Sequence, residues 1–295
     1  MVGSLNQDLS VQVDRIPGAG ETLLVPGHTA GAGGKGNNQA IAARRFGSEV
    51  AMIGAVGGDD AGRQLVSQLE AEGIDVTGLR VDRNCVTGVA FIIVEPSGEN
   101  RIMVSQGANA AVSPELVSEN STAIAAADVV LAQLEVSNDA VIEAFRAATG
   151  ITVLNAAPAR DLPARLLELT DILVVNESEL ASLAEAASEA TTVEEVTAQA
   201  ALIRGARAVV VTRGAEGCVL VRPGCEPVSF AAPVVTVVDT TGAGDCFCGS
   251  LAAQLSRGVA LPDAVKVSVQ AASVSATRAG AAVSMPTEGD VAVLV

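Results

Sequence analysis

An aspartate that follows a Gly-Ala-Gly turn is the residue of this sequence best placed for acid–base chemistry. The segment reads Asp239-Thr-Thr-Gly-Ala-Gly-Asp245. We predict a strand over residues 234–238 before it and a helix running to about residue 256 after it. The N–H groups that begin a helix bind anions, and a carboxylate beside them can take a proton from a hydroxyl. The alternative, in which Asp245 is only an acidic residue at a helix start, stays open.

A second glycine-rich segment, residues 31–39, reads Gly-Ala-Gly-Gly-Lys-Gly-Asn-Asn-Gln and leads into an Ala-rich stretch. It matches the GxGxxG pattern of dinucleotide sites, but Pro-Gly-His at 26–28 interrupts the strand that such a site requires. The Walker A pattern fails because Lys35 is followed by Gly rather than Ser or Thr. A bare turn lets a ligand approach main-chain N–H groups, and Lys35 and Asn38 can bond to hydroxyls. A tight packing turn is the alternative.

The elements that must hold these segments follow a strand–helix rhythm from about residue 128 onward. This rhythm is typical of a parallel sheet covered by helices on both faces. We predict strands at 128–134, 151–154, 172–175 and 208–212, and helices at 138–148 and 192–204. Residues 31–80 fit the same scheme, with a helix from about 37, a strand at 50–56 and a helix at 60–72. The main body is therefore predicted to be an α/β sandwich.

Residues 9–26 and 86–105 break this rhythm, since apolar and polar residues alternate and turn signals occur at Pro17-Gly18 and Pro96-Ser-Gly98. We predict antiparallel strands outside the parallel sheet. A sheet this small needs something to pack against, which covering a site or pairing with another subunit would provide. The predicted division is a core of residues 1–8, 27–85 and 106–295 and a small β lid of residues 9–26 and 86–105.

Composition excludes several classes of function. The 295 residues carry a formal net charge of −16 and include five Phe, no Trp and no Tyr. The acidic balance argues against a nucleic-acid partner, and the missing Trp and Tyr exclude an aromatic sugar platform or base stacking by those residues. The single histidine, His28, excludes metal sites built on two histidines. Five cysteines without CxxC spacing support neither a disulfide framework nor a zinc site.

The sequence also predicts the cellular location of the protein. No window reaches the roughly 18 uninterrupted apolar residues of a membrane span, and the first ten residues lack the basic and apolar regions of a secretory signal. We therefore expect a cytoplasmic protein without a membrane partner.

Residues 33–47 (GGKGNNQAIAARRFG) and 239–251 (DTTGAGDCFCGSL) together resemble the two signatures of the PfkB, or ribokinase-like, sugar kinases. The resemblance runs from Gly3 to Pro286. It implies a three-layer α/β/α sandwich with a mostly parallel central sheet and a small β-sheet lid. It also implies ATP-dependent phosphorylation of D-ribose at the 5-hydroxyl, giving D-ribose 5-phosphate and ADP. Another sugar of the family, deoxyribose or fructose, and a non-catalytic sugar-binding protein on the same fold stay open as alternatives.

The resemblance assigns a role to each matching position. Asp245 is the expected general base, and the N–H groups of Gly242, Ala243 and Gly244 are the expected anion hole. The sugar is expected to contact Asn6, Asp8, Gly34, Lys35, Asn38 and Glu135 together with Asp245. ATP and Mg²⁺ are expected at Asn176, Glu179, Thr212, Gly214, Gly217 and Gly244. A monovalent cation, K⁺, is expected at Asp239, Thr241, Ser275, Arg278, Gly280 and Ser284.

Three further expectations follow from the resemblance. The lid is expected to pair between subunits, which makes the protein a homodimer. Adenine is expected to rest on aliphatic side chains, because the chain has no Trp or Tyr. Only Met1 and Val2 precede Gly3, where the family has a full strand, so we expect either that this strand of the central sheet is shortened or that the true start lies upstream.

Overall fold

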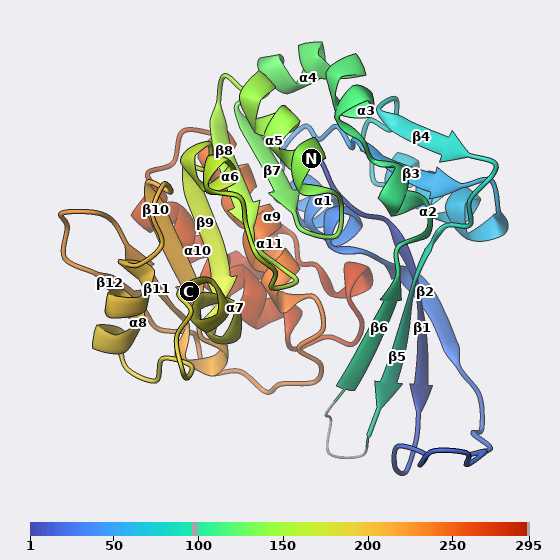
Figure 1. Cartoon of the computed structure of the whole chain (residues 1–295). Coiled ribbons are helices and arrows are strands. Elements are labelled where there is room, and N and C mark those ends of the chain that lie inside the picture. The colour runs from blue at the N-terminus through green and yellow to red at the C-terminus, as the bar shows by residue number, and fades with distance from the viewer. Residues whose placement is uncertain (96–99, 294–295) are drawn as a thin grey trace.

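The computed structural model describes residues 1–95 and 100–293. A sheet with helices on both faces forms the body of the molecule, and a second sheet projects from it (Figure 1). The six-stranded body sheet has the order β12-β11-β10-β9-β8-β7. Its strands are β7 (Val129–Gln133), β8 (Ile151–Asn155), β9 (Ile172–Asn176), β10 (Ala208–Thr212), β11 (Cys218–Val221) and β12 (Val228–Phe230). The first four pair in parallel, as predicted, and the last two are antiparallel.

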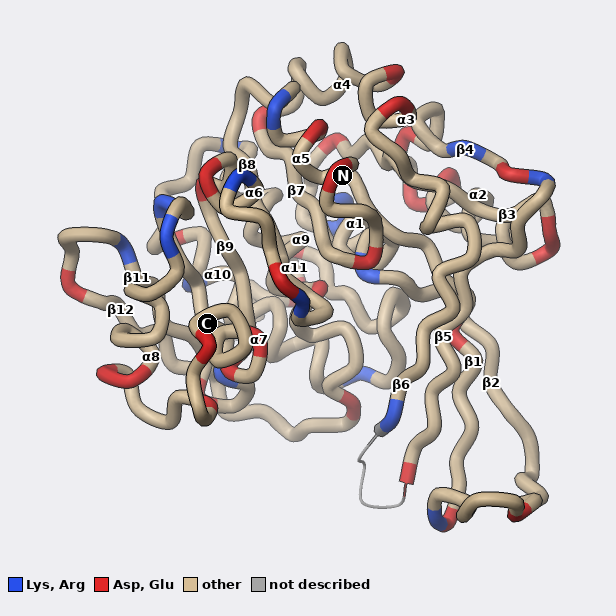
Figure 2. The backbone as a smooth tube through the Cα atoms, in the orientation of Figure 1, with Lys and Arg blue, Asp and Glu red and all other residues tan. Residues whose placement is uncertain are grey.

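Alternate residues of each body strand point to opposite faces, and each face is covered by its own set of helices. Leu154 and Leu173 lie in a core with the helices that follow the parallel strands. Val153 and Val174 lie in a second core with two C-terminal helices. The predicted three-layer sandwich is therefore confirmed. In Figure 2 the tube along β7–β10 is tan, since these strands contain no charged residue.

The helices of the first face are α3 (Pro114–Glu119), α4 (Ser121–Ala126), α5 (Asn138–Ala147), α6 (Ala164–Glu168), α7 (Glu177–Leu183) and α8 (Val193–Ala200). The other face carries α9 (Ala243–Ser256) and α10 (Leu261–Ser275), and α1 (Lys35–Arg45) packs beside α9. The remaining helices are α2 (Asp60–Ala71) and α11 (Glu288–Ala292), with 3₁₀ turns η1 (Gly107–Ala111), η2 (Gly214–Glu216) and η3 (Ala282–Ser284).

The start of the chain continues the body sheet with very short pairings. Val2 forms isolated parallel bridges to Ile53 and Ala132, which lie on either side of it. The predicted strand at 50–56 is shorter than expected: only β3 (Gly54–Gly57) is a strand, paired with β4 (Leu79–Asp82). Residues 50–53 instead bond through the backbone to Asp75 on one side and to Met1 and Gly3 on the other.

The second sheet, which we call the lid sheet, has the order β2-β1-β5-β6. Its strands are β1 (Asn6–Gln12), β2 (Thr29–Gly33), β5 (Gly88–Val94) and β6 (Asn100–Ser105). The predicted antiparallel pair over 86–105 is confirmed as β5 and β6; the turn at Pro96-Ser-Gly98 lies outside the described residues. The predicted hairpin at Pro17-Gly18 is wrong, because β1 pairs with β2 after a long loop over residues 13–28.

The lid sheet also includes residues 6–8 and 29–33, which the predicted division assigned to the core. The division into lid and core stays a prediction. A second correction concerns residues 234–238, which do not form a strand. No neighbouring strand pairs with them in the described structure, and Val234, Val237 and Val238 are largely exposed. No helix in the described part of the chain has both the length and the apolar character needed to cross a membrane.

Candidate active site

Helix α9 begins in the second glycine cluster. Gly242 caps it with a left-handed φ of 77°, a conformation that favours glycine. The Ala243 N–H donates to the Thr240 carbonyl at 3.1 Å and closes the turn. Gly242 and Gly244 line a small cavity of about 130 Å³ together with Asp245. Of the three residues expected to form the anion hole, Gly242 and Gly244 line this cavity, and the N–H of Ala243 is engaged within the turn.

Asp245 lies in the first turn of α9 and is 8% exposed. Its Oδ2 accepts a hydrogen bond from Asn38 Nδ2 at 2.9 Å, and its Oδ1 accepts one from Gln39 Nε2 at 2.8 Å. Asn38 was predicted to lie here, whereas Gln39 was given no role. The two glycine clusters, more than 200 residues apart, are therefore joined at this carboxylate.

The turn between β2 and α1 passes directly over β1. Gly34 has φ +89°, and a Cβ on it would lie 2.7 Å from the Asn6 backbone nitrogen. Glycine is therefore required both by the backbone conformation and by the close approach of the two segments. This turn places Lys35 at the start of α1, inside the small cavity with Asp245.

Lys35 sits among carboxylates. Burial alone would lower its pKa, but the negative charges of Asp245, Glu135 and Glu179 outweigh burial and raise the pKa above its ordinary value. Lys35 thus stays protonated, and its positive charge lies between the residues expected to bind the sugar and those expected to bind the nucleotide.

Glu135 follows β7 at the carboxyl end of the body sheet. Its Oε2 accepts hydrogen bonds from the Ser4 hydroxyl, from the Lys35 backbone N–H at 3.1 Å and from Asn6 Nδ2 at 3.5 Å. Ser4 is fully buried. The sequence assigned it no role, and its contact with a residue 131 positions away has no local signal in the sequence.

The lid strand β1 contributes Asn6 and Asp8. Asn6 is buried, and its Oδ1 accepts a bond from Asn109 Nδ2 at 2.7 Å. Asn109, which sequence reasoning did not assign to the site, also donates to the Leu5 carbonyl and accepts from the Leu5 N–H. Burial, assisted by the charges of Glu135 and Asp245, raises the pKa of Asp8 to about 7.

The nucleotide-side residues border the same small cavity. Asn176 caps α7 and exchanges two hydrogen bonds with Glu179: its side chain accepts from the Glu179 N–H at 2.8 Å, and its own N–H donates to Glu179 Oε2 at 2.9 Å. Burial raises the pKa of Glu179. Asn176, Glu179 and Thr212 line the cavity with Lys35 and Asp245, so the structure gathers both predicted halves of the site.

A larger cavity of about 450 Å³ adjoins the small one at Thr212 and Gly244. Its walls are mainly aliphatic. They comprise η2, residues 232–237 and parts of α9 and α10, including Gly214, Gly217, Val234, Val235, Val237, Phe247, Val269 and Ala272. This explains the incorrect strand prediction, because Val234, Val235 and Val237 face an open cavity and not a sheet. Gly217 has φ +90°, and a Cβ there would lie 1.9 Å from the Phe230 carbonyl oxygen.

Five of the residues expected to hold a monovalent cation form three hydrogen bonds with one another beside α9. Asp239 accepts from the N–H groups of Thr241 at 2.9 Å and Gly280 at 2.8 Å, and the hydroxyls of Ser275 and Ser284 lie 3.0 Å apart. The Arg278 side chain instead forms an ion pair with Asp290. Within residues 1–95 and 100–293, no three His, Cys, Asp or Glu side chains form a cluster that could hold a metal ion.

The sequence model of the pfkB family carbohydrate kinases matches residues 1–288, which include every element of this site. The chain belongs to the PfkB family of carbohydrate kinases. Both glycine clusters lie within the matched residues. The family resemblance stated from the sequence is therefore confirmed.

Individual PfkB proteins are similar over nearly the whole chain. The ribokinase of Schizosaccharomyces pombe is 37% identical over 298 residues, covering 97% of this chain and 94% of that protein. A bifunctional ribokinase/ribose-5-phosphate isomerase A of Fructilactobacillus sanfranciscensis is 39% identical over 292 residues, and the chain spans only 54% of its length. The structure of Arabidopsis thaliana ribokinase complexed with ribose and ATP has a TM-score of 0.92 at 30% identity, covering 99% of this chain and 96% of that one.

Proposed function

We propose that this protein transfers the γ-phosphoryl group of ATP to the 5-hydroxyl of D-ribose, giving D-ribose 5-phosphate and ADP. The observation that carries the proposal is the position of Asp245 at the start of α9, in one cavity with Lys35, Asn176 and Glu179. The similarity to proteins named ribokinase, one of them solved with ribose and ATP, supports this choice of substrates.

On the sugar side, the hydroxyl groups of ribose would form hydrogen bonds with side-chain amides and carboxylates of the protein. Asn6 and Asn38 present amide groups, and Asp8 and Glu135 present carboxyl groups. Three donors already occupy Oε2 of Glu135, which leaves its other oxygen for the substrate. The sugar can thus be recognised by hydrogen bonds without an aromatic platform.

In the transfer step, Asp245 accepts the proton of the 5-hydroxyl as that oxygen forms its bond to the γ-phosphorus. The bond from the γ-phosphorus to the bridging oxygen breaks, and ADP leaves with that oxygen. The N–H groups at the start of α9 and the Lys35 ammonium stabilise the charge on the transferring group. Phosphoryl transfer requires mainly such positioning and charge stabilisation.

On the nucleotide side, the 450 Å³ cavity is proposed to hold the adenosine of ATP and the 130 Å³ cavity its phosphates. Adenine would rest against Val235, Val237 and Val269. The phosphates would then lie between Asn176, Thr212 and the start of α9, within reach of Asp245.

Mg²⁺ is proposed to accompany ATP. The buried carboxylate of Glu179 suits it, because Mg²⁺ prefers oxygen ligands and is commonly held by one or two carboxylates, substrate phosphates and water. When bound, Mg²⁺ neutralises charge on the phosphates. K⁺ is proposed to bind at the loops joined by Asp239, with oxygens of Asp239, Thr241, Ser275, Arg278, Gly280 and Ser284 as its ligands. That site would add positive charge beside the anion hole.

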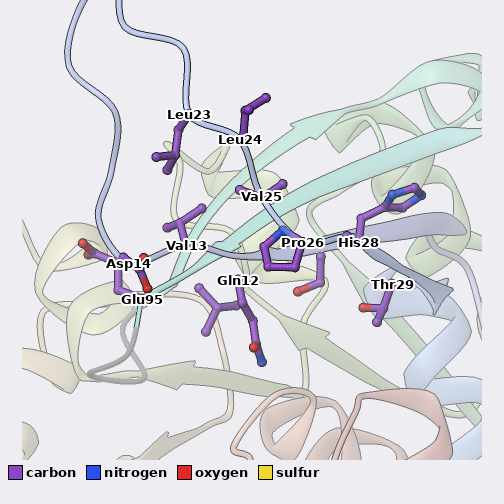
Figure 3. Close-up of a pocket in the computed structure, with 13 residues that line it drawn as sticks. Gln12, Val13, Asp14, Leu23, Leu24, Val25, Pro26, His28, Thr29 and Glu95 are labelled. Carbon is purple, nitrogen blue, oxygen red and sulfur yellow. The ribbon is translucent and has the colours of Figure 1, made fainter.

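The lid sheet is proposed to pair with that of a second copy of the chain. Apolar side chains stay exposed on it, with Phe91 at 44% and Met103 at 59%. At its tip, the loop over residues 13–28 and the ends of β1 and β5 line an open cavity of about 780 Å³. Figure 3 shows Leu23, Leu24 and Val25 on this loop, with Asp14 and Glu95 at one end of the cavity and His28 at the other.

The oligomeric proposal is tested by light scattering coupled to size-exclusion chromatography. Met103→Asp is expected to convert a dimer into a monomer, because it places a charge in the apolar contact. Leu202→Asp is the matched control, since Leu202 is 62% exposed but lies on the body. A monomeric wild-type protein would contradict the proposal.

The substrate proposal is tested by coupled ADP-release assays with D-ribose, 2-deoxyribose and fructose. D-ribose is expected to give the highest kcat/KM. Turnover confined to another sugar would refute the choice of ribose, and ribose binding without turnover on any sugar would favour a non-catalytic sugar-binding protein.

A further inference from the structure

Helices α1 and α9 pack unusually closely next to Asp245. Gly249 lies one turn after Asp245 on the same face of α9, and a Cβ on it would lie 2.4 Å from the Gln39 carbonyl oxygen. The missing side chain lets the helices approach until two consecutive amide side chains of α1 reach one carboxylate. Asn38 binds its Oδ2 and Gln39 its Oδ1. Gln39 itself is completely buried.

Every polar atom of the Gln39 side chain has a defined partner. Its Nε2 donates to Asp245 Oδ1 at 2.8 Å and to Asn155 Oδ1 at 3.0 Å. Its Oε1 accepts from Gln133 Nε2 at 2.7 Å. Asn155 is oriented in turn, since its Nδ2 donates to the Val174 carbonyl at 3.3 Å. A glutamine amide has two donor hydrogens, and here both are used.

The hydrogen bond to Asp245 Oδ1 and the hydrogen bond from Gln133 Nε2 require the same orientation of the Gln39 amide. If the amide were turned over, Oε1 would face Asp245 Oδ1, and two acceptors would meet without a proton between them. It would also point Nε2 at the Nε2 of Gln133, so that two donors met. The orientation seen here satisfies both ends at once. Gln133 sits at the end of β7, fully buried, and so ties the carboxylate to the body sheet.

We propose that Gln39, oriented by Gln133, is a positioning residue that holds the carboxylate of Asp245 in the plane needed to accept the proton of the sugar hydroxyl. Asn38 alone leaves the carboxylate free to rotate about its Cβ–Cγ bond. With both oxygens bonded, the remaining lone pairs point in fixed directions. The inference rests on the proposed function, in which Asp245 is the general base.

The first test replaces Gln39 with Met, which is of similar length but donates no hydrogen bond. Small errors in the placement of a reacting group cost up to about 100-fold in rate, so we expect kcat on D-ribose to fall about 10- to 100-fold. The Kd for ribose from calorimetry should change less than about threefold, because Gln39 touches no predicted sugar ligand other than Asp245. Gln254→Met is the matched control, since Gln254 is a buried glutamine at the far end of α9.

The second test uses Gln133→Met, which removes the group that orients Gln39 without touching Asp245. We expect kcat to fall in the same direction as for Gln39→Met, and by a smaller factor, because Gln39 can still adopt its native orientation part of the time. An unchanged kcat would overturn the role given to Gln133. Thermal unfolding of each variant identifies any loss of folded protein.

The decisive comparison places Gln39→Met in an Asp245→Asn background. If Gln39 acts through the base, the added substitution changes the residual kcat by less than about twofold, since residues that work as one unit are non-additive. A fall of the same factor in both backgrounds would show a merely structural role and overturn the inference. An unchanged kcat for Gln39→Met alone would also overturn it. A wild-type protein that fails to turn over ribose would instead refute the proposed function.

Discussion

Asp8 is the carboxyl group whose protonation should couple most strongly to the stability of this protein. It lies on β1, paired with Gly31 on one side and Ala90 on the other. Its carboxyl group packs against Gly33, where a Cβ would lie 2.1 Å from Oδ2. Burial, with the added charges of Glu135 and Asp245, raises its pKa from 3.8 to about 7, although Lys35 opposes the shift.

The sign of the effect follows from proton linkage. Between pH 3.8 and about 7 the folded protein holds more protons on Asp8 than the unfolded chain does. Stability therefore falls as the pH rises through this window, and the contribution of Asp8 becomes constant above it. At about 1.4 kcal/mol per pKa unit, the full difference corresponds to about 4 kcal/mol. Because the carboxyl is partly exposed and water screens it, we expect about 2 kcal/mol to be observed.

The assay is urea unfolding of the wild-type protein and the Asp8→Asn variant at intervals from pH 5 to pH 8.5. Asparagine keeps the shape of the side chain and does not titrate. The free energy of unfolding of the variant, relative to the wild type, should rise with pH and level off near pH 8. A difference that stays flat across the range, or that falls as the pH rises, would refute the account of the Asp8 environment.

Two other substitutions probe the elements that position the site. Gly249→Ala should lower stability by about 1–3 kcal/mol through overpacking, and it should lower kcat by moving Asn38 away from Asp245. Gly27→Ala is the control, because an added Cβ there meets nothing within 4 Å. An unchanged melting temperature for Gly249→Ala would contradict the close packing of α1 and α9. Ala272→Phe should fill the 450 Å³ cavity and raise the KM for ATP about tenfold or more, with the ribose Kd unchanged. An unaltered KM for ATP would place adenine elsewhere.

The body sheet was predictable because its strands are continuous apolar runs between helical stretches. Residues 152–154 and 172–175 illustrate this, since their side chains are buried on both faces. The apolar run at 234–238 has the same composition and was therefore predicted as a strand. A local pattern cannot distinguish valines that face a sheet neighbour from valines that line a cavity.

From the residues alone, the sequence indicated site residues only where one short segment contained the signal, and the family resemblance supplied expectations such as Asn6 and Glu135. Asp245 directly follows the glycines of its segment, and Asn38 lies in the same segment as Lys35. Ser4, Asn109 and Gln133 act through partners about 90 to 130 residues away, and no local spacing shows such a pair. Gln39 lies inside a recognised segment, yet its role depends on the distance between α1 and α9, which only the structure gives.

The central claim is that Asp245 removes the proton from the hydroxyl of ribose during phosphoryl transfer. The most direct measurement compares wild type with Asp245→Asn, with D-ribose and ATP, recording ribose Kd by calorimetry and kcat by ADP release. We predict wild-type turnover, a ribose Kd in the variant within about threefold of wild type, and a kcat at least about 100-fold lower. Wild-type turnover retained in the Asp245→Asn variant would contradict the claim.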